Sequence, residues 1–325
     1  MLTMETARAC GYKEMGKYDL AVVGAGPAGI GAALAAARQG LRVALVESCG
    51  FPGGVGTQAC VPLFFGFGVD GRQSTAGISE EFIRRMDAEG AASLLLHDGC
   101  AMPEFLPIGG RPLTAKVQLQ PEMMKLTYRR MLKEAQVDAI FYAQMVDAVT
   151  QGPRVRALLV NFLEGPGLLT ADYFIDATGD ANLSFLAGNT FRLGREADSL
   201  CQPMTLCFRI TGVSFKEFFS RYSEIQALYK EFKNKGKLKN PREDILVFDT
   251  ANENIIHFNS TRIIKLNPTD PFDLSRAEIE GRQQMIELVE FLKDNFEFLK
   301  NISIVSSASE IGIRESRMIN GEHIL

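Results

Sequence analysis

The hydrophobic pattern of the chain alternates between two periods, as expected of a protein that mixes strands and helices. Continuous apolar runs at 20–23 and 43–46 predict buried strands, and the alanine-rich stretch between them predicts a slim helix. Apolar residues at helical spacing predict further helices, which cover residues 79–88, 121–136, 181–187, 214–220, 223–235 and 273–299. Strands that alternate with helices are typical of an α/β fold with a parallel sheet.

A group of shorter strands follows the helix at 121–136. Residues 137–144 predict one strand. A β-meander is then predicted between turns rich in glycine and proline, with strands at 145–150, 155–162 and 168–174. A strand ending at Asp176 follows and runs into small residues. The meander therefore interrupts the strand–helix alternation of the first domain.

Residues 196–300 predict a smaller α+β module. Its long helix is expected to begin with a capping box, Ser275 to Glu278, and to bury a stripe that contains Ile279, Ile286, Val289 and Leu292. Residues 302–305 predict a strand that returns toward the first domain. The expected organisation is a disordered leader at 1–17, a Rossmann-like domain at 18–195, a cap at 196–300 and a return segment at 301–325.

The first strand–helix–strand unit carries a glycine motif with its full context. Gly24 allows a tight turn, Gly26 lets the backbone approach a pyrophosphate, and Gly29 lets the helix pack against the strand. Pro27 suits the first turn of a helix, whose free N–H groups attract phosphate. Glu47 ends the second strand near the spacing of about 20 residues expected of an acid that binds ribose hydroxyls. The unit predicts a dinucleotide site.

Composition and charge narrow the class of protein. The chain has 325 residues, 46% of them hydrophobic, and a formal net charge of −4, which gives no electrostatic footprint for nucleic acid. No apolar stretch predicts a membrane span, and the first residues lack the apolar core of a signal peptide. The cysteines form no CxxC pair and there are 3 histidines, so no metal site is expected. These features favour a cytoplasmic protein.

Taken together, the motifs resemble the FAD-dependent oxidoreductase family of the glutathione-reductase-like superfamily, akin to fumarate reductase flavoproteins. The resemblance spans residues 18–325. It rests on the glycine motif with Glu47 and on the segments 53–57, 77–82, 176–180, 192–195, 202–204, 274–278 and 311–317.

The resemblance implies an α/β fold in which a Rossmann-like FAD/NAD(P)-binding domain, with a parallel sheet and an inserted β-meander, carries a smaller α+β cap domain. It implies FAD as the cofactor and a small molecule as the substrate. Val146 would offer its backbone to the adenine. The implied cofactor-binding residues are Gly24, Gly26, Pro27, Ala28, Gly29, Glu47, Gly53, Gly54, Thr57, Val146, Ala177, Thr178, Gly179 and Asp180.

Two alternatives remain beside this interpretation. An NAD-dependent enzyme uses the same glycine motif, although the loop at 53–57 and the motif at 177–180 suit FAD better. Members of the family continue into a later glycine-rich segment that covers the flavin, whereas this sequence stops soon after 311–317. The chain is therefore also expected to be the front part of such an enzyme, binding only the ADP part of the cofactor or completed by a separate polypeptide.

Arg314 is the candidate for the chemistry, because an arginine fork suits an anionic substrate. The alternative is an ion pair with Glu310 or Glu315. The motif at 177–180 has two interpretations as well: a cofactor contact, or an ordinary turn in which Asp180 caps the next helix.

Other reactive side chains have ordinary structural explanations. His257 lies between apolar residues and is expected to be a buried strand residue rather than a proton donor. Arg192 and Arg195 are expected to pair with Glu196 and Asp198. Cysteines without a close partner are expected to be unreactive rather than to form a catalytic disulfide, and those considered are Cys49, Cys60, Cys201 and Cys207.

Overall fold

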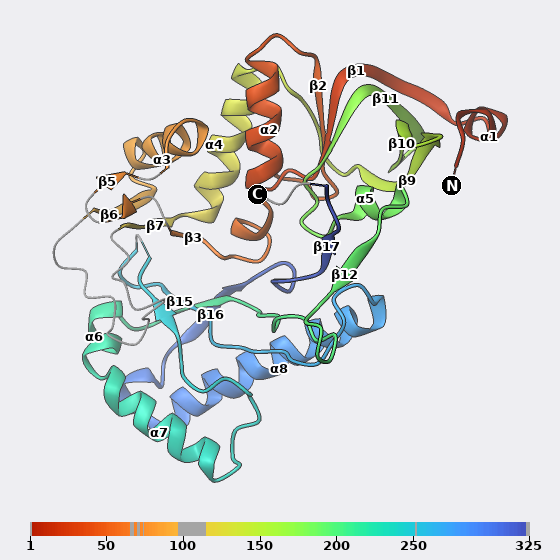
Figure 1. Ribbon diagram of the computed structural model, residues 1–325. Helices are drawn as coiled ribbons and strands as arrows, with labels where there is room; N and C mark the ends of the chain where they lie inside the picture. Colours follow the sequence, from red (N-terminus) through yellow and green to blue (C-terminus); the bar gives the residue numbers. More distant parts are fainter. Residues whose placement is uncertain are drawn as a thin grey trace.

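A computed structural model describes residues 2–65, 68–69, 72–73, 75–96, 115–250 and 252–322. His97, His323 and Cys100 lie outside these ranges. Figure 1 shows two parts, an upper one built on a mixed sheet with helices beside it and a lower one whose small sheet lies above a long helix. The α/β fold class predicted from the sequence is confirmed.

The sheet of the upper part has the strand order β8-β2-β1-β11-β10-β9. Strand β1 (Lys13–Val23) lies between β2 (Val43–Val46) and β11 (Gly165–Asp176), and β8 (Asp138–Ile140) follows β2, all in parallel. Strands β9 (Gln144–Gln151) and β10 (Arg154–Phe162) pair in antiparallel fashion on the far side of β11. The parallel strands therefore end together at one edge of the sheet.

Strand β11 serves both the parallel sheet and the meander. Its first half pairs with β10, while its whole length runs beside β1, from Gly167 opposite Lys13 to Asp176 opposite Val23. The sequence analysis divided this stretch into two strands, at 168–174 and at 173–176. A single strand forms because its backbone pairs with β10 on one side and with β1 on the other, and the meander thus extends the main sheet.

The segment 2–17 differs from the disordered leader expected from the sequence. Helix α1 (Met4–Ala9) is followed directly by β1, which begins at Lys13. Ala7 is fully buried against the outer face of the meander, in a cluster with Val149, Ala157, Leu159 and Leu168. This apolar face would otherwise be exposed, so covering it gives the segment a reason to fold.

Helices α2 (Pro27–Ala37), α3 (Ile78–Ala88) and α4 (Pro121–Glu134) cover one face of the sheet (Figure 1). Leu20 and Val22 point into this layer, whereas Ala21 and Val23 point to the opposite face. That second face is covered by residues of the meander and by Leu183 of α5 (Asn182–Leu186). The alternation fixes β1 as a strand buried on both sides.

Peripheral strands form smaller sheets next to α3 and α4. Their pairings are antiparallel, and the strands are β3 (Leu63–Phe65), β4 (Gly68–Val69), β5 (Arg72–Gln73), β6 (Ala92–Leu96) and β7 (Ala115–Leu119). Across the junction between the two parts, β12 (Phe191–Leu193) pairs with β17 (Arg317–Ile319).

The lower part, here called the cap, is built on an antiparallel sheet in the order β14-β15-β13-β16. One face of this sheet packs on helix α8 (Pro271–Asn295), beside α6 (Phe215–Ser220) and α7 (Tyr222–Asn234). The strands are β13 (Phe208–Thr211), β14 (Val247–Phe248), β15 (Ile256–Phe258) and β16 (Ser303–Ser307).

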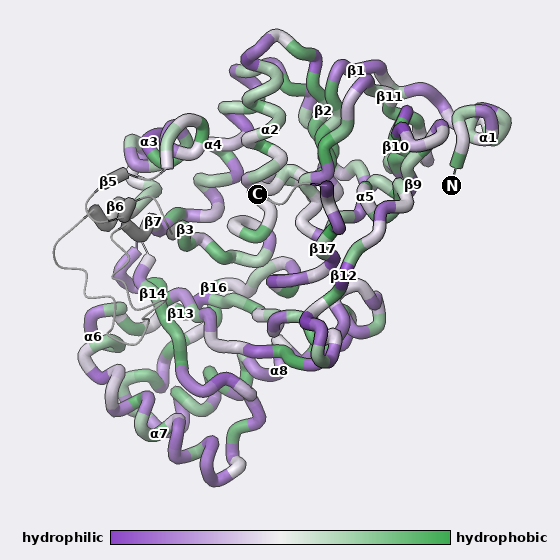
Figure 2. The backbone as a smooth tube through the Cα atoms, in the orientation of Figure 1, coloured by the Kyte–Doolittle hydropathy of each residue, from purple (hydrophilic) through white to green (hydrophobic). Residues whose placement is uncertain are grey.

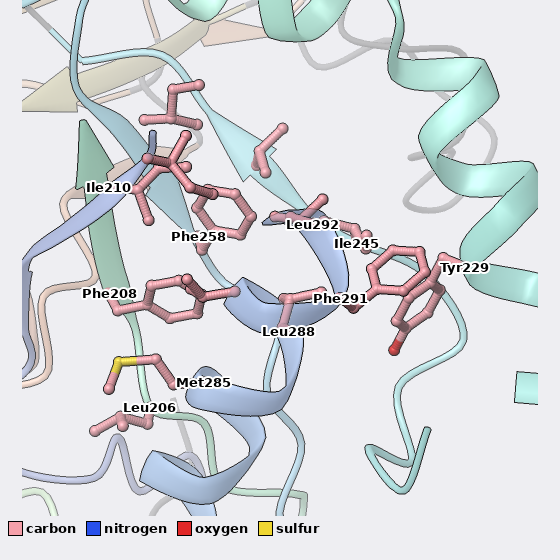
Figure 3. Close-up of a cluster of buried hydrophobic side chains, with 14 of the residues drawn as sticks. Leu206, Phe208, Ile210, Tyr229, Ile245, Phe258, Met285, Leu288, Phe291 and Leu292 are labelled. Carbon is pink, nitrogen blue, oxygen red and sulfur yellow. The ribbon is translucent and has the colours of Figure 1, made fainter. Parts of the chain in front are cut away.

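Aromatic residues dominate the core of the cap. Figure 3 shows Phe208 and Phe258 beside the α8 side chains Leu288 and Leu292. The two phenylalanine rings stack with their centroids 4.8 Å apart, and both are buried. Burial of such rings is a main favourable contribution to folding.

Three expectations about the cap need correction. Helix α8 is capped by Asp270, whose carboxylate accepts hydrogen bonds from two backbone N–H groups, so the Ser275–Glu278 pair lies inside the helix and is no cap. Ile279 and Ile286 are 60% and 47% exposed, because the buried stripe is shifted toward Met285 and Leu288. The predicted return strand pairs instead with β13 as part of the cap sheet.

Apolar residues are distributed over short buried segments (Figure 2). In Figure 2 strand β2 and the last residues of β1 are strongly hydrophobic, whereas the outer helices alternate between polar and apolar positions. Among the described residues, no helix combines the length and the apolar character that a membrane crossing needs.

We expect Phe258→Ala to lower the free energy of unfolding by about 3–5 kcal/mol, since it empties the centre of the cap core. Phe272→Ala is the matched control, because Phe272 is 79% exposed at the start of α8. Its effect should stay within about 0.5 kcal/mol. Denaturant unfolding followed by circular dichroism measures both, and equal effects of the two substitutions would contradict this assignment of the core.

Candidate functional site

A cleft of about 450 Å³ opens at the edge where the parallel strands end. Val23, Val46 and Ala177 line it at the carboxyl ends of β1, β2 and β11, and the segment 310–316 closes it from the side of the cap. Ligands of open α/β sheets bind at this edge. The volume falls in the range of small-molecule and cofactor sites.

The glycine motif forms a tight turn that brings the start of α2 to the cleft. Gly24 has a φ of 96°, and a Cβ on it would lie 2.5 Å from the carbonyl oxygen of Ala177. A Cβ on Gly29 would lie 1.9 Å from the carbonyl oxygen of Gly24. A Cβ on Gly26, by contrast, would meet nothing closer than 4.0 Å. Gly24 and Gly29 thus allow close packing, while Gly26 borders open space.

The N-terminus of α2 faces this space. Gly26, Pro27 and Ala28 line the cleft, and the first intrahelical hydrogen bond is donated by Ile30 to the carbonyl oxygen of Gly26. The N–H groups of Ala28 and Gly29 therefore precede the helical ladder. A helix N-terminus with such N–H groups is a favourable place for phosphate.

Glu47 is buried beside this turn, with 7% of its surface exposed. One carboxylate oxygen accepts a hydrogen bond from the Ala25 N–H at 2.7 Å. The other accepts from the Cys49 N–H at 2.8 Å and from the Ser48 hydroxyl at 3.1 Å. The acid thus ties β2 to the glycine turn, and it also lines the cleft.

The glycine-rich loop after Glu47 packs directly on the glycine turn. The Gly53 N–H donates to the Ala25 carbonyl oxygen at 2.7 Å, and a Cβ on Gly54 would lie 2.9 Å from the Cα of Gly26. The Thr57 hydroxyl donates to the carbonyl oxygen of Pro52 at 3.0 Å. Gly53 and Thr57 therefore stabilise the loop through hydrogen bonds outside the cleft, while Gly54 lines the cleft.

The sequence left open whether Asp180 caps the next helix, and the segment after β11 shows that it does not. Asp180 does not cap α5, because Ala181 takes the cap position with a φ of 55° and no side-chain hydrogen bond. Asp176 instead accepts hydrogen bonds from the backbone N–H groups of Thr178 and Ser184. The Asp180 carboxylate accepts from the Ser316 hydroxyl at 2.6 Å and thereby joins two walls of the cleft.

Arg314 lines the cleft, but neither of the ion pairs considered from the sequence holds it. Its Nε donates to the side-chain oxygen of Gln202 at 2.7 Å, and the Gln202 backbone N–H donates to Glu315. The neighbouring Arg317 donates to the Asp180 carbonyl oxygen at 3.0 Å. Arg314 is exposed and belongs to the cleft lining, on a loop held by the contacts of its neighbours.

The structure brings most of the predicted cofactor residues together, although their roles remain predictions. Gly29, Gly53, Thr57 and Val146 lie outside the lining, and Val146 is 42% exposed. The predicted residues that line the cleft are Gly24, Gly26, Pro27, Ala28, Glu47, Gly54, Ala177, Thr178, Gly179 and Asp180.

The sequence analysis missed residues that follow β8. Ala143, Gln144 and Met145 line the cleft, and the Ala143 N–H donates to the Glu47 carbonyl oxygen at 2.9 Å. The order of the strands could have indicated these residues. Because β8 is the next parallel strand after β2, the chain that leaves β8 must pass the same edge of the sheet. Val146 lies just beyond this passage.

Arg195, His257 and Cys49 have the structural roles that the sequence favoured. Arg195 pairs with Asp198 at 2.7 Å. His257 is buried, and burial together with Arg209 lowers its pKa to about 3, so its imidazole is neutral near pH 7. Burial is also the main cause that raises the pKa of Cys49 to about 12, which leaves it a protonated thiol.

The donor set of the site fits a dinucleotide better than a metal ion. Among the residues that the structure describes, no cluster of histidine, cysteine or acidic side chains has the arrangement of a metal site. The described cysteines are free thiols: Cys10, Cys49, Cys60, Cys201 and Cys207. A helix N-terminus, an open glycine and a buried acid at the mouth of a parallel sheet are instead the parts that a dinucleotide requires.

Solved structures with the same fold include a monooxygenase and a halogenase. One is the p-nitrophenol 4-monooxygenase PnpA from Pseudomonas putida, with 14% identity, a TM-score of 0.54, and 94% of this chain and 70% of that chain covered. Another is the myxobacterial chondrochloren halogenase CndH, described as a variant of FAD-dependent halogenases, with 16% identity, a TM-score of 0.54, and 93% and 65% covered.

A third is a geranylgeranyl bacteriochlorophyll reductase-like protein from Thermoplasma acidophilum, with 13% identity and a TM-score of 0.52. The alignment covers 91% of this chain and 66% of that one, so this chain spans about two thirds of the length of these proteins. At such identities the likeness concerns the fold alone. No curated protein sequence is similar enough to count as a relative. The model of the FAD dependent oxidoreductase family matches residues 19–325, so this chain belongs to that family and FAD is its cofactor.

Proposed function

We propose that this chain is an oxidoreductase that binds FAD in the cleft and uses it for hydride or electron transfer with an anionic small molecule. The observation that carries the proposal is the convergence of three groups on one space: the N-terminus of α2, the open face of Gly26 and the buried carboxylate of Glu47. Each suits a different part of a dinucleotide.

Different residues would bind different parts of the cofactor. The N–H groups of Ala28 and Gly29 would take the pyrophosphate, because both precede the helical ladder and Ala28 lines the cleft. Glu47 would accept hydrogen bonds from the adenosine ribose with the lone pairs that its backbone contacts leave available. The backbone of Gln144 and Met145, rather than that of Val146, would lie beside the adenine.

When bound, the flavin itself supplies the redox chemistry. The task of this chain is to orient the substrate and to stabilise its charge. Arg314 is suited to it, because Gln202 fixes the Nε while the two terminal nitrogens stay available for a carboxylate. The hydrogen bond between Ser316 and Asp180 holds this segment against the cofactor side of the cleft.

A second candidate function is a chain that binds only the ADP part of FAD, or of NAD, and depends on a separate polypeptide to complete the flavin site. Both candidates bind the ADP part of the cofactor in the same cleft. They differ in whether this chain alone, or a separate polypeptide, completes the site of the isoalloxazine ring. The purified protein distinguishes the two: bound, reducible flavin supports an oxidoreductase, whereas equal affinity for FAD and ADP without reduction supports the second candidate.

We expect Glu47→Gln to weaken FAD binding about tenfold to a hundredfold, as loss of a hydrogen bond to a charged group does. Glu297→Gln is the control, since Glu297 lies on the surface of the cap and pairs with Lys300. Quenching of flavin fluorescence during titration of the apoprotein measures both affinities. Unchanged affinity in Glu47→Gln would remove this acid from the ribose site.

Two glycines of the same helix provide a second test. A Cβ on Gly29 collides with the Gly24 carbonyl oxygen, whereas a Cβ on Gly31 meets nothing within 4 Å. Gly29→Ala should therefore abolish FAD retention or fold poorly. Gly31→Ala should retain FAD and raise the free energy of unfolding by about 0.5–1 kcal/mol, because alanine favours the helix. Flavin content after gel filtration and thermal unfolding report the two effects, and full FAD retention in Gly29→Ala would contradict the turn.

A further inference from the structure

The inner face of the cap sheet, opposite its aromatic core, carries polar side chains that the cofactor site does not use. Phe208 and Phe258 face α8, so their neighbours Arg209 on β13 and His257 on β15 face the other way. Arg209 and His257 are direct register partners and therefore lie side by side on this inner face.

Both side chains have a polar atom without a partner. Within the described ranges, the Arg209 Nε and the His257 Nδ1 are buried and make no hydrogen bond. His257 is only 1% exposed, and the Phe248 ring lies with its centroid 6.1 Å from the imidazole. Polar atoms buried in this way are nearly always satisfied by a partner, so each of these points to a group that the protein chain itself does not supply.

Arg209 lies near the loop that borders the cleft. Burial raises the pKa of the Cys60 thiol, and the nearby guanidinium of Arg209 opposes this shift. Cys60 directly follows Ala59, which lines the cleft, and Cys207, one strand position before the core residue Phe208, lies near both Cys60 and Arg209. Arg209 therefore lies near a residue that directly follows the cleft wall.

We propose that Arg209 and His257 form a carboxylate-binding site on the inner face of the cap sheet. The guanidinium supplies the charge and its Nε–H donates to one carboxylate oxygen, while the imidazole donates from Nδ1 to the same group. A single carboxylate satisfies both orphaned atoms. Placing this carboxylate on the oxidoreductase substrate rests on the proposed function, but the site itself does not require FAD.

The charge state of the pair suits an anion and no cation. Burial, and then Arg209, keep His257 neutral near pH 7, so the pair carries the single positive charge of the guanidinium. In the described part of the chain, Arg209 forms no ion pair, in contrast to the surface arginines Arg195 and Arg221. An uncompensated guanidinium with a buried Nε favours binding of a negatively charged group.

Titration with simple carboxylates tests the site directly. The chain has 3 histidines, so imidazole resonances in ¹⁵N-labelled apoprotein can be assigned with His257→Gln alone. We expect acetate or benzoate to shift the His257 resonances in a saturable way, and the neutral isosteres acetamide and benzamide to bind at least tenfold more weakly. No saturable shift with either acid, or equal binding of acids and amides, would overturn the proposal.

Variants of Arg209 test whether its guanidinium binds the carboxylate. Arg209→Gln should weaken carboxylate binding at least tenfold, consistent with the loss of a charge-assisted hydrogen bond. Arg195→Gln removes an exposed arginine paired with Asp198 and should leave binding unchanged. Arg209→Lys keeps the charge without the fork, so an intermediate affinity is expected even if the glutamine variant fails to fold. Unchanged binding in a folded Arg209→Gln protein would overturn the assignment.

The two proposals fail separately. Carboxylate binding by an apoprotein that does not take up FAD would support this site and contradict the proposed function. Uptake of FAD without any effect of carboxylates on His257 would support the proposed function and contradict the carboxylate site.

Discussion

The site depends on the close contact between the glycine turn and its two neighbouring strands. Gly24 packs on Ala177 at the end of β11, and the Ala25 N–H is held by the carboxylate of Glu47 at the end of β2. Side chains at the turn would push these strand ends apart. With them apart, α2 would no longer direct its N–H groups into the cleft, and Glu47 would lose the contact that fixes its own position.

The cap is positioned relative to this turn by the segment 309–317. The Ser309 N–H donates to the Gln58 carbonyl oxygen at 3.0 Å, the Gly312 N–H to Thr205 at 2.8 Å, and the Ser316 hydroxyl to Asp180. One short segment thus contacts the glycine-rich loop, the cap and the end of β11. The cap, whose inner face is proposed to bind a carboxylate at Arg209, is thereby held beside the cleft.

The sequence predicts the features that local chemistry determines. The glycine turn, Pro27 and Glu47 belong to one strand–helix–strand unit, so their spacing suffices to predict both the fold and the family. Contacts between distant segments leave no such signal. The Arg314–Gln202 bond joins residues 112 positions apart, and the role of Asp180 becomes visible only when Ser316 lies beside it. Helix α1 was missed because its folding depends on the meander that it covers.

Competition between nucleotides tests most directly whether the cleft holds the ADP half of FAD. Bound FAD should be displaced from the protein by ADP, because ADP carries the ribose and pyrophosphate that Glu47 and the start of α2 would bind. FMN, which lacks the adenosine, should not displace FAD at the same concentrations. Displacement by FMN with no effect of ADP would contradict this account.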